Sequence, residues 1–145
     1  MRNEVTDKES RRRLGRSVLA LIVGSLVAII LSIGTDVGLH LLGMFPALGQ
    51  PTSDPMLLLA TAYRTLYGVF SSYVVGRLAP GKPMQHALVG GVIGLVVSVG
   101  GAVATWNSGL GPHWYPLTLI ALAIPAAWTG GKLRLMQLHG EMAAQ

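Results

Sequence analysis

The chain has 145 residues, of which 51% are hydrophobic and only 12% are charged, with a formal net charge of +5. A soluble domain usually carries about twice that charged fraction, so the composition excludes an ordinary soluble domain and indicates one polytopic membrane domain. The chain contains no cysteine, which excludes disulfides, thiolate nucleophiles, iron–sulfur sites and zinc–cysteine sites. In a membrane protein the basic residues set topology, so we expect the lipid bilayer and not nucleic acid as the partner of the positive charge.

Residues 1–16 are polar and mixed in charge, and we expect a cytoplasmic tail that is disordered or a frayed helix. The run Ser10-Arg11-Arg12-Arg13-Leu14 loosely resembles a twin-arginine export signal. The apolar segment behind it is too long for a signal, and no small-residue cleavage site is evident. We therefore interpret the arginines as a positive-inside anchor that also contacts anionic lipid.

The first predicted span covers residues 17–42, which is longer than the roughly 30 Å hydrocarbon core, so it should tilt or extend past the surface. Polar side chains share one of its helical faces: Ser25, Ser32, Asp36 and His40. Gly34 and Gly38 form a GxxxG motif on the opposite face. That motif permits close approach of a neighbouring helix or of another subunit.

The second predicted span, residues 56–78, carries Arg64 near its middle and follows a proline-rich connection without Lys or Arg. Asp54 and Pro55 are a helix start signal, with Asp54 as N-cap and Pro55 at the first helical position. An arginine in mid-span costs about 2.5 to 3.5 kcal/mol on insertion scales, so it should face protein or water and have a partner. Helical spacing gathers polar side chains on the arginine face: Thr61, Arg64, Tyr67 and Ser71.

A tight turn at residues 79–83 makes the second and third spans antiparallel neighbours. The third predicted span, residues 84–106, has a face of small residues for helix packing, among them Gly90, Gly94, Ser98 and Gly101. A loop at residues 107–116 again lacks Lys and Arg. The fourth span, residues 117–135, contains Pro125, which should kink it, and residues 137–145 form a short polar tail.

The basic residues predict the topology. Ten of the eleven Lys and Arg lie in the N-terminal tail, at Arg77 and Lys82 beside or in the turn after the second span, or near the C-terminus, and Arg64 is the eleventh. The positive-inside rule then gives four spans with both termini cytoplasmic. The predicted fold is an all-α, antiparallel four-helix transmembrane bundle in the cell inner membrane.

Asp36 and Arg64 should lie at similar depth, about 10 and 12 Å below the outer ends of their helices. We predict that they form an intramembrane ion pair, with His40 one turn above Asp36 as a third member. The pair is either a structural clasp that fixes helix register or part of a polar cavity for a solute, an anion or protons. His40 is either a hydrogen-bonded structural histidine or a proton relay.

Metal and cofactor sites are poorly supported. Asp36 and His40 have metal-ligand spacing but too few further ligands, and haem ligation by His40 and His113 stays a disfavoured alternative. Catalytic residues are not predicted either, because the chain has no second buried carboxylate, no nucleophile beside a base and no phosphate-binding glycine loop.

Two classes of function are favoured, and a membrane enzyme, which would need a bound cofactor, is a third and less favoured alternative. The first is transport or permeation of a small solute or ion past Asp36, Arg64 and His40, in a homo-oligomer that shares a pathway along the glycine faces. The second is a non-catalytic accessory, assembly or structural subunit that packs through those faces in a larger membrane complex.

Six short motifs resemble a group of small bacterial four-helix inner-membrane proteins of unassigned function. They are the run from Tyr63-Arg64 through Tyr67-Gly68, Arg77-Leu78-Ala79-Pro80, Pro83-Met84, His86-Ala87-Leu88, Gly111-Pro112-His113-Trp114-Tyr115-Pro116 and Ala127-Trp128-Thr129-Gly130-Gly131. The resemblance covers the second to fourth spans and implies a bacterial inner-membrane protein, with no activity to carry over. The patterns of the small multidrug-resistance proteins and of the fluoride channels are absent.

Overall fold

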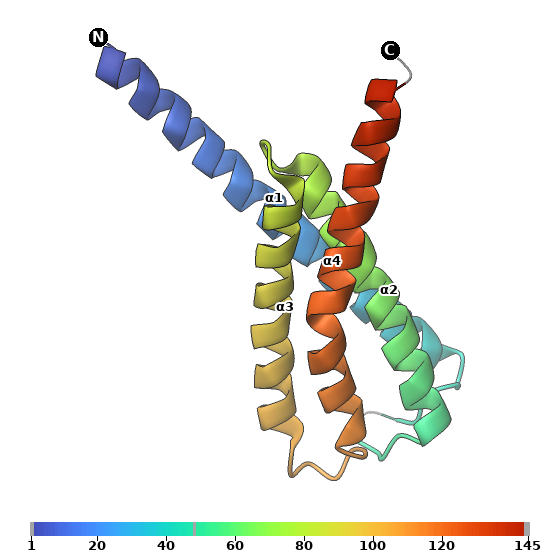
Figure 1. Cartoon of the computed structure of the whole chain (residues 1–145). Helices are drawn as coiled ribbons and strands as arrows, with labels where there is room; N and C mark the ends of the chain where they lie inside the picture. The colour runs from blue at the N-terminus through green and yellow to red at the C-terminus, as the bar shows by residue number, and fades with distance from the viewer. Residues whose placement is uncertain (1, 48, 144–145) are drawn as a thin grey trace.

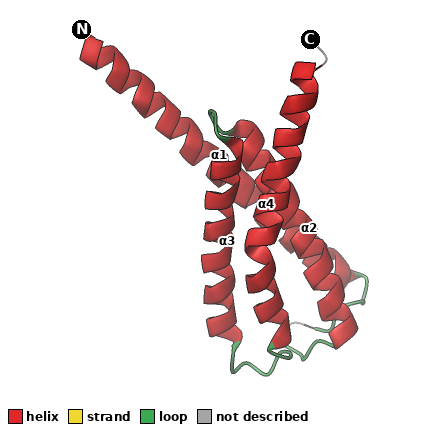
Figure 2. Ribbon diagram, in the orientation of Figure 1, coloured by secondary structure: helices red, strands yellow, loops and turns green. Residues whose placement is uncertain are grey.

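The computed structural model describes residues 2–47 and 49–143, and within them the protein consists of four helices and no strand (Figure 2). The helices are α1 (Arg2–Leu41), α2 (Asp54–Leu78), α3 (Pro83–Thr105) and α4 (Trp114–Ala143). The predicted all-α class with four helices is confirmed. Met1, Leu48, Ala144 and Gln145, which the sequence places in the tails and the first loop, lie outside the described residues.

Both polar tails are helical over their described residues, so the helices extend beyond the predicted spans. α1 continues without interruption from Arg2 through the predicted first span, and α4 runs on to Ala143. Neither tail contains proline, and most of their residues favour helix, so nothing in either segment stops a helix that has already begun. Figure 1 shows the N-terminal part of α1 projecting away from the other three helices.

The start of α2 differs by one residue from the prediction. Ser53 occupies the N-cap position, without a side-chain capping bond, and Asp54 is already helical. The Asp54 carboxylate instead accepts a hydrogen bond from the indole Nε1 of Trp114, at 3.2 Å, and so ties the start of α2 to the start of α4.

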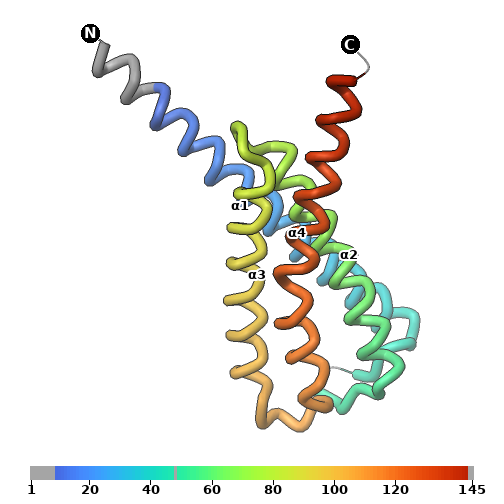
Figure 3. The backbone as a smooth tube through the Cα atoms, viewed as in Figure 1, coloured from blue at the N-terminus to red at the C-terminus, as the bar shows by residue number. Residues whose placement is uncertain are grey.

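The two termini and the short turn between α2 and α3 lie at one end of the molecule, and the two longer loops lie at the other (Figure 1). The two loops are joined by a hydrogen bond from the Thr52 backbone N–H to the Leu110 carbonyl, at 2.9 Å. We call this end, with residues 42–47, 49–53 and 106–113, the loop end. Pro125 lies inside α4, and Figure 3 shows α4 changing direction along its length.

Helices α2, α3 and α4 form a closely packed group, in which α4 contacts both of the others. Glycines allow the approach: a methyl group at Gly130 would overlap the Val69 carbonyl oxygen of α2, and one at Gly91 would overlap Ala127 of α4. The predicted packing positions Gly34, Gly38, Gly94 and Gly101 have nothing within 4 Å of where a Cβ would lie, whereas Gly90 has Leu21 and Val75 at 3.7 Å.

Helix α1 contacts α2 and, more slightly, α3. Its one close crossing is at Ala20, which is 1% exposed, and at Gly24, whose missing side chain leaves room for Val75 of α2. Beyond this crossing, large apolar side chains of α1 are exposed, such as Ile30 at 66% and Ile33 at 57%.

Among the described residues, two helical segments are long and apolar enough to cross a membrane, namely Glu9–Leu41 and Pro83–Thr105. The other two helices are less apolar for identifiable reasons. α2 carries Arg64 in its middle. α4 contains Pro125, and its C-terminal half carries Lys132 and Arg134.

Candidate functional site

The ion pair that helical spacing predicts is present. α1 supplies Asp36 and α2 supplies Arg64, and the guanidinium Nη2 lies 2.6 Å from the carboxylate Oδ2. The side chains are 34% exposed for Arg64 and 27% exposed for Asp36. A partly desolvated pair of this kind has a stronger Coulomb attraction than a pair on an aqueous surface.

Two tyrosines, neither of which is among the predicted members of the polar site, complete the surroundings of the pair. The Tyr63 hydroxyl donates a hydrogen bond to Oδ1 of Asp36, so each carboxylate oxygen has its own donor from α2. The Tyr115 ring, at the start of α4, has its centroid 5.9 Å from the Arg64 Cζ, within the range of a cation–π contact. Three helices therefore hold the pair.

Tyr115 lies just before the predicted fourth span, and its phenol group is neutral near pH 7. Burial raises the pKa of Tyr115 above its ordinary value, and the nearby Asp36 carboxylate raises it further, while Arg64 acts in the opposite direction. The hydroxyl therefore keeps its proton and can act as a hydrogen-bond donor.

One buried nitrogen of the guanidinium has no hydrogen-bond partner within the described part of the chain. Among the side-chain nitrogen and oxygen atoms of the described residues, Nε of Arg64 is the buried one without a hydrogen-bond partner. A buried, unpaired donor on a charged group is costly, so it marks a place where a further acceptor would be bound favourably.

His40 lies next to the pair but does not bind the carboxylate. Its Nδ1 donates to the backbone carbonyl of Asp36 at 2.7 Å, and its ring meets the Phe45 ring edge-on, with centroids 5.6 Å apart. The predicted group of three residues is therefore reduced to the Asp36–Arg64 pair. The His40 ring is hydrogen bonded to the backbone of its own helix and does not reach the carboxylate.

The other predicted members of the polar site make helix contacts. The Tyr67 and Thr35 hydroxyls are hydrogen bonded at 2.8 Å, which joins α1 and α2 next to the ion pair. Ser71 donates to the Gly24 carbonyl of α1 at 2.7 Å, at the close crossing. Thr61 is buried and donates to a carbonyl of its own helix at 2.8 Å.

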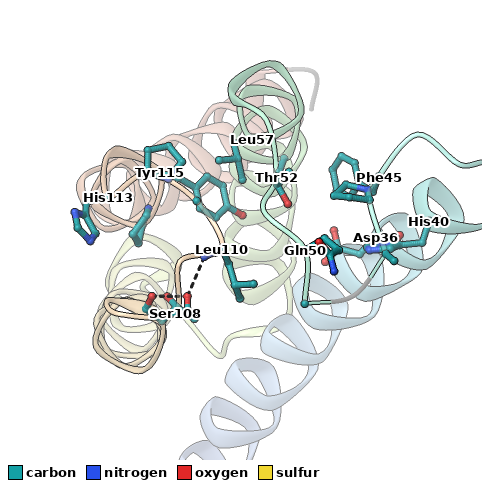
Figure 4. Close-up of a pocket in the computed structure, with 18 of the residues that line it drawn as sticks. Asp36, His40, Phe45, Gln50, Thr52, Leu57, Ser108, Leu110, His113 and Tyr115 are labelled. Atoms are coloured by element: carbon teal, nitrogen blue, oxygen red, sulfur yellow. Dashed lines mark hydrogen bonds between the residues drawn. The ribbon is translucent and has the colours of Figure 1, made fainter.

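A pocket of about 330 Å³ opens at the loop end, and we call it the loop-end pocket (Figure 4). Asp36 and Arg64 contribute to its wall, and both loops supply the rest together with the ends of the helices. Among its lining side chains are Asp36, His40, Phe45, Gln50, Thr52, Leu57, Ala60, Arg64, Trp106, Ser108, Leu110, His113 and Tyr115.

A second pocket, of about 430 Å³, lies between the helices, and we call it the inter-helix pocket. All four helices line it, and small and hydroxyl side chains are frequent in its wall: Ser25, Ser32, Thr65, Gly68, Ser71, Ser72, Gly90, Gly94 and Ser98. Asp36 and Arg64 are the two described residues that line both pockets. The ion pair therefore stands at the junction between them.

The side chains of this site can bind an anion and exchange a proton. The described residues hold no group of three or more His, Asp or Glu side chains that could bind a metal ion. The pair offers a carboxylate that can take up a proton and a guanidinium that can bind an anion. No protein-family model, curated protein or solved structure matches this chain.

Proposed function

We propose that the chain is a four-span membrane protein of a bacterial inner membrane, with both termini on the cytoplasmic side. Helices α1 and α3 are apolar enough to span a membrane. Large apolar side chains are exposed over much of the molecule, as expected of a surface that faces lipid. The Lys and Arg residues other than Arg64 belong to the end with the termini and the short turn, whereas the two loops of the opposite end have none. The bacterial location rests on the resemblance of the second to fourth helices.

Within that membrane we propose that the protein passes a small solute or ion through the two pockets. The observation that carries this proposal is the position of the Asp36–Arg64 pair, which lines both pockets at their junction. A solute that entered at the loop end would meet a carboxylate and a guanidinium before it reached the hydroxyl-lined inter-helix pocket. Ionisable residues within membrane spans are costly to keep and commonly mark such pathways.

The pair would act as a selective barrier in this pathway. While Arg64 is bound to Asp36, the junction is closed by side chains of α1 and α2 that satisfy each other's charge. Opening needs a ligand or a proton that replaces one partner, because separating the two charges without replacement leaves each of them partly desolvated and unpaired.

Flux from proteoliposomes tests this function. The purified chain is reconstituted, and release of potassium, chloride, lactate and glycerol is measured for the wild type and for Arg64→Ala. We expect wild-type flux of at least one of these probes above protein-free liposomes, and a change of at least tenfold in Arg64→Ala. Arg77→Ala, which removes an exposed guanidinium from the other end of the same helix, is the matched control and should behave as wild type. Absence of flux for all four probes would contradict the proposal.

A non-catalytic membrane subunit is the second candidate, and one observation favours it. The small-residue faces of α1 and α3 have open space in front of them, at Gly34, Gly38, Gly94, Gly100 and Gly101. Such faces allow a helix of another chain to approach closely. Gentle membrane extraction followed by co-purification tests this candidate, which would be supported if Gly34→Leu and Gly101→Leu release a bound subunit while the chain itself stays folded.

A further inference from the structure

We propose that Arg64 binds a monocarboxylate in the loop-end pocket, and that Asp36 takes up one proton as the carboxylate binds. This inference rests on the proposed passage of a solute past the ion pair and names the chemical class of that solute. The arriving acid anion and the proton together carry no net charge, so the site holds one positive and one negative group before and after binding.

The geometry of the guanidinium carries the first step. Arginine binds a carboxylate best through two parallel N–H donors, and Nε and Nη2 form one such edge. Asp36 uses only half of this edge, because its Oδ2 accepts from Nη2 while its Oδ1 accepts from the Tyr63 hydroxyl. Nε is left buried and without a partner among the described residues. A carboxylate that replaced Asp36 could accept from both donors.

The charges of the site carry the second step. Asp36 is the one acidic residue and Arg64 the one Lys or Arg residue among those that line either pocket. The titratable groups around Asp36 are His40 on α1, Tyr63 and Arg64 on α2, Tyr115 on α4 and His113 in the second loop, while α3 contributes none to either pocket. While Asp36 is ionised, the pair has no net charge and does not attract an anion. When Asp36 gains a proton from water in the pocket, its carboxyl group becomes neutral, and the Arg64 cation can bind the arriving carboxylate.

The wall of the loop-end pocket favours an organic acid over an inorganic anion. Apolar groups from both loops and from the start of α2 surround the space beside Arg64: Phe45, Leu57, Ala60, Leu110 and Pro112. A hydrocarbon part would contact these groups while the carboxylate binds Arg64. The acid could come from water through the loop end or from the lipid through the inter-helix pocket, so the test needs one probe of each kind.

Binding is measured on the full chain in lipid nanodiscs, with butyrate as the water-soluble probe and dodecanoate as the membrane-soluble one. Trp106 lines the loop-end pocket and stacks on His113 with ring centroids 4.2 Å apart, so tryptophan fluorescence reports occupation. A pH-indicator dye in weak buffer counts the protons. We expect one proton taken up for each acid bound, and an affinity that tightens up to about tenfold for each unit of pH decrease.

Two variants separate the roles of the pair. Asp36→Asn imitates the protonated carboxyl group, so it should bind butyrate without proton uptake and with an affinity that does not change with pH. Arg64→Gln should lose binding by at least tenfold, while Arg77→Gln, outside both pockets, should bind as wild type. If Arg64→Gln does not fold, the proton count of the wild type and of Asp36→Asn decides.

Each remaining outcome has a defined meaning. Binding of butyrate supports the aqueous route, and binding of dodecanoate alone supports the route from the lipid. Binding of neither acid, an equal response to chloride, or proton uptake by Asp36→Asn equal to that of wild type would overturn the inference. Flux of potassium or glycerol without acid binding would support the proposed function and contradict this inference. Acid binding without flux of any probe would support the binding site and contradict the proposed function.

Discussion

Helix α1 and the group formed by α2, α3 and α4 are held by different forces. Within the group, backbones approach closely at glycine and alanine, as at Gly130 and Ala127, and the contacts are mainly van der Waals. Beyond its one close crossing, α1 is fastened to α2 through polar side chains, namely Thr35, Asp36 and their partners. Protons, water and anions can replace a partner in the second kind of contact but not in the first. α1 is therefore the element whose attachment a ligand can change.

The largest expected effect is in the packed group. Gly130→Ala would place a methyl group against the Val69 carbonyl oxygen and the Ser72 Cβ, and because backbone cannot move aside cheaply the helices must separate. We expect a loss of about 3 kcal/mol in the free energy of unfolding, measured by denaturation in detergent micelles.

The matched control for that substitution is Gly34→Ala on α1, where nothing lies within 4 Å of the new methyl group. It should change the free energy of unfolding by less than about 0.5 kcal/mol, unless another chain covers this face. Equal losses at Gly130 and Gly34 would contradict the contrast between the two regions.

The ion pair should give the second effect in size. Arg64→Ala and Asp36→Ala each leave a partly desolvated charge without its partner, and because both groups are about a third exposed we expect a loss of about 1 to 2 kcal/mol. The double variant should recover part of the summed loss, and a double-mutant cycle in the same unfolding assay measures the coupling. A double variant that is worse than the sum of the singles would show that the two residues do not stabilise each other.

A smaller effect concerns the second polar contact between α1 and α2. Thr35→Val or Tyr67→Phe removes one hydrogen bond, which in membrane proteins is worth about 0.6 kcal/mol on average. The double variant should loosen the part of α1 nearest the loop end while the α2, α3 and α4 group keeps its packing. Spin-label distances from α1 to α2, compared with distances from α2 to α4, would show a broader distribution for the first pair alone.

How much of this arrangement the sequence can predict depends on the kind of interaction. The four helices follow from apolar runs punctuated by proline and glycine, and the pairing of Asp36 with Arg64 follows from equal depth on antiparallel neighbours. Tyr115 could not be found in this way, because its approach to Arg64 depends on how α4 is placed against α2. The close crossings at Gly130 and Gly91 could not be predicted for the same reason. Helix rotation and crossing angle decide which small residue meets a neighbouring helix, and periodicity determines neither of them.

The smallest expected effect is at Tyr115, which connects the two regions. Its ring comes from the packed group and lies 5.9 Å from the Arg64 Cζ, while Arg64 in turn binds α1. Tyr115→Phe keeps an aromatic face toward the guanidinium and should leave the free energy of unfolding within about 0.3 kcal/mol of wild type, whereas Tyr115→Leu should lose about 0.5 to 1 kcal/mol. The double-mutant cycle of Asp36 with Arg64, repeated in the Tyr115→Leu background, then shows whether the packed group supports the ion pair. A smaller coupling in that background means that α4 positions the guanidinium, and an unchanged coupling means that α1 and α2 hold the pair by themselves.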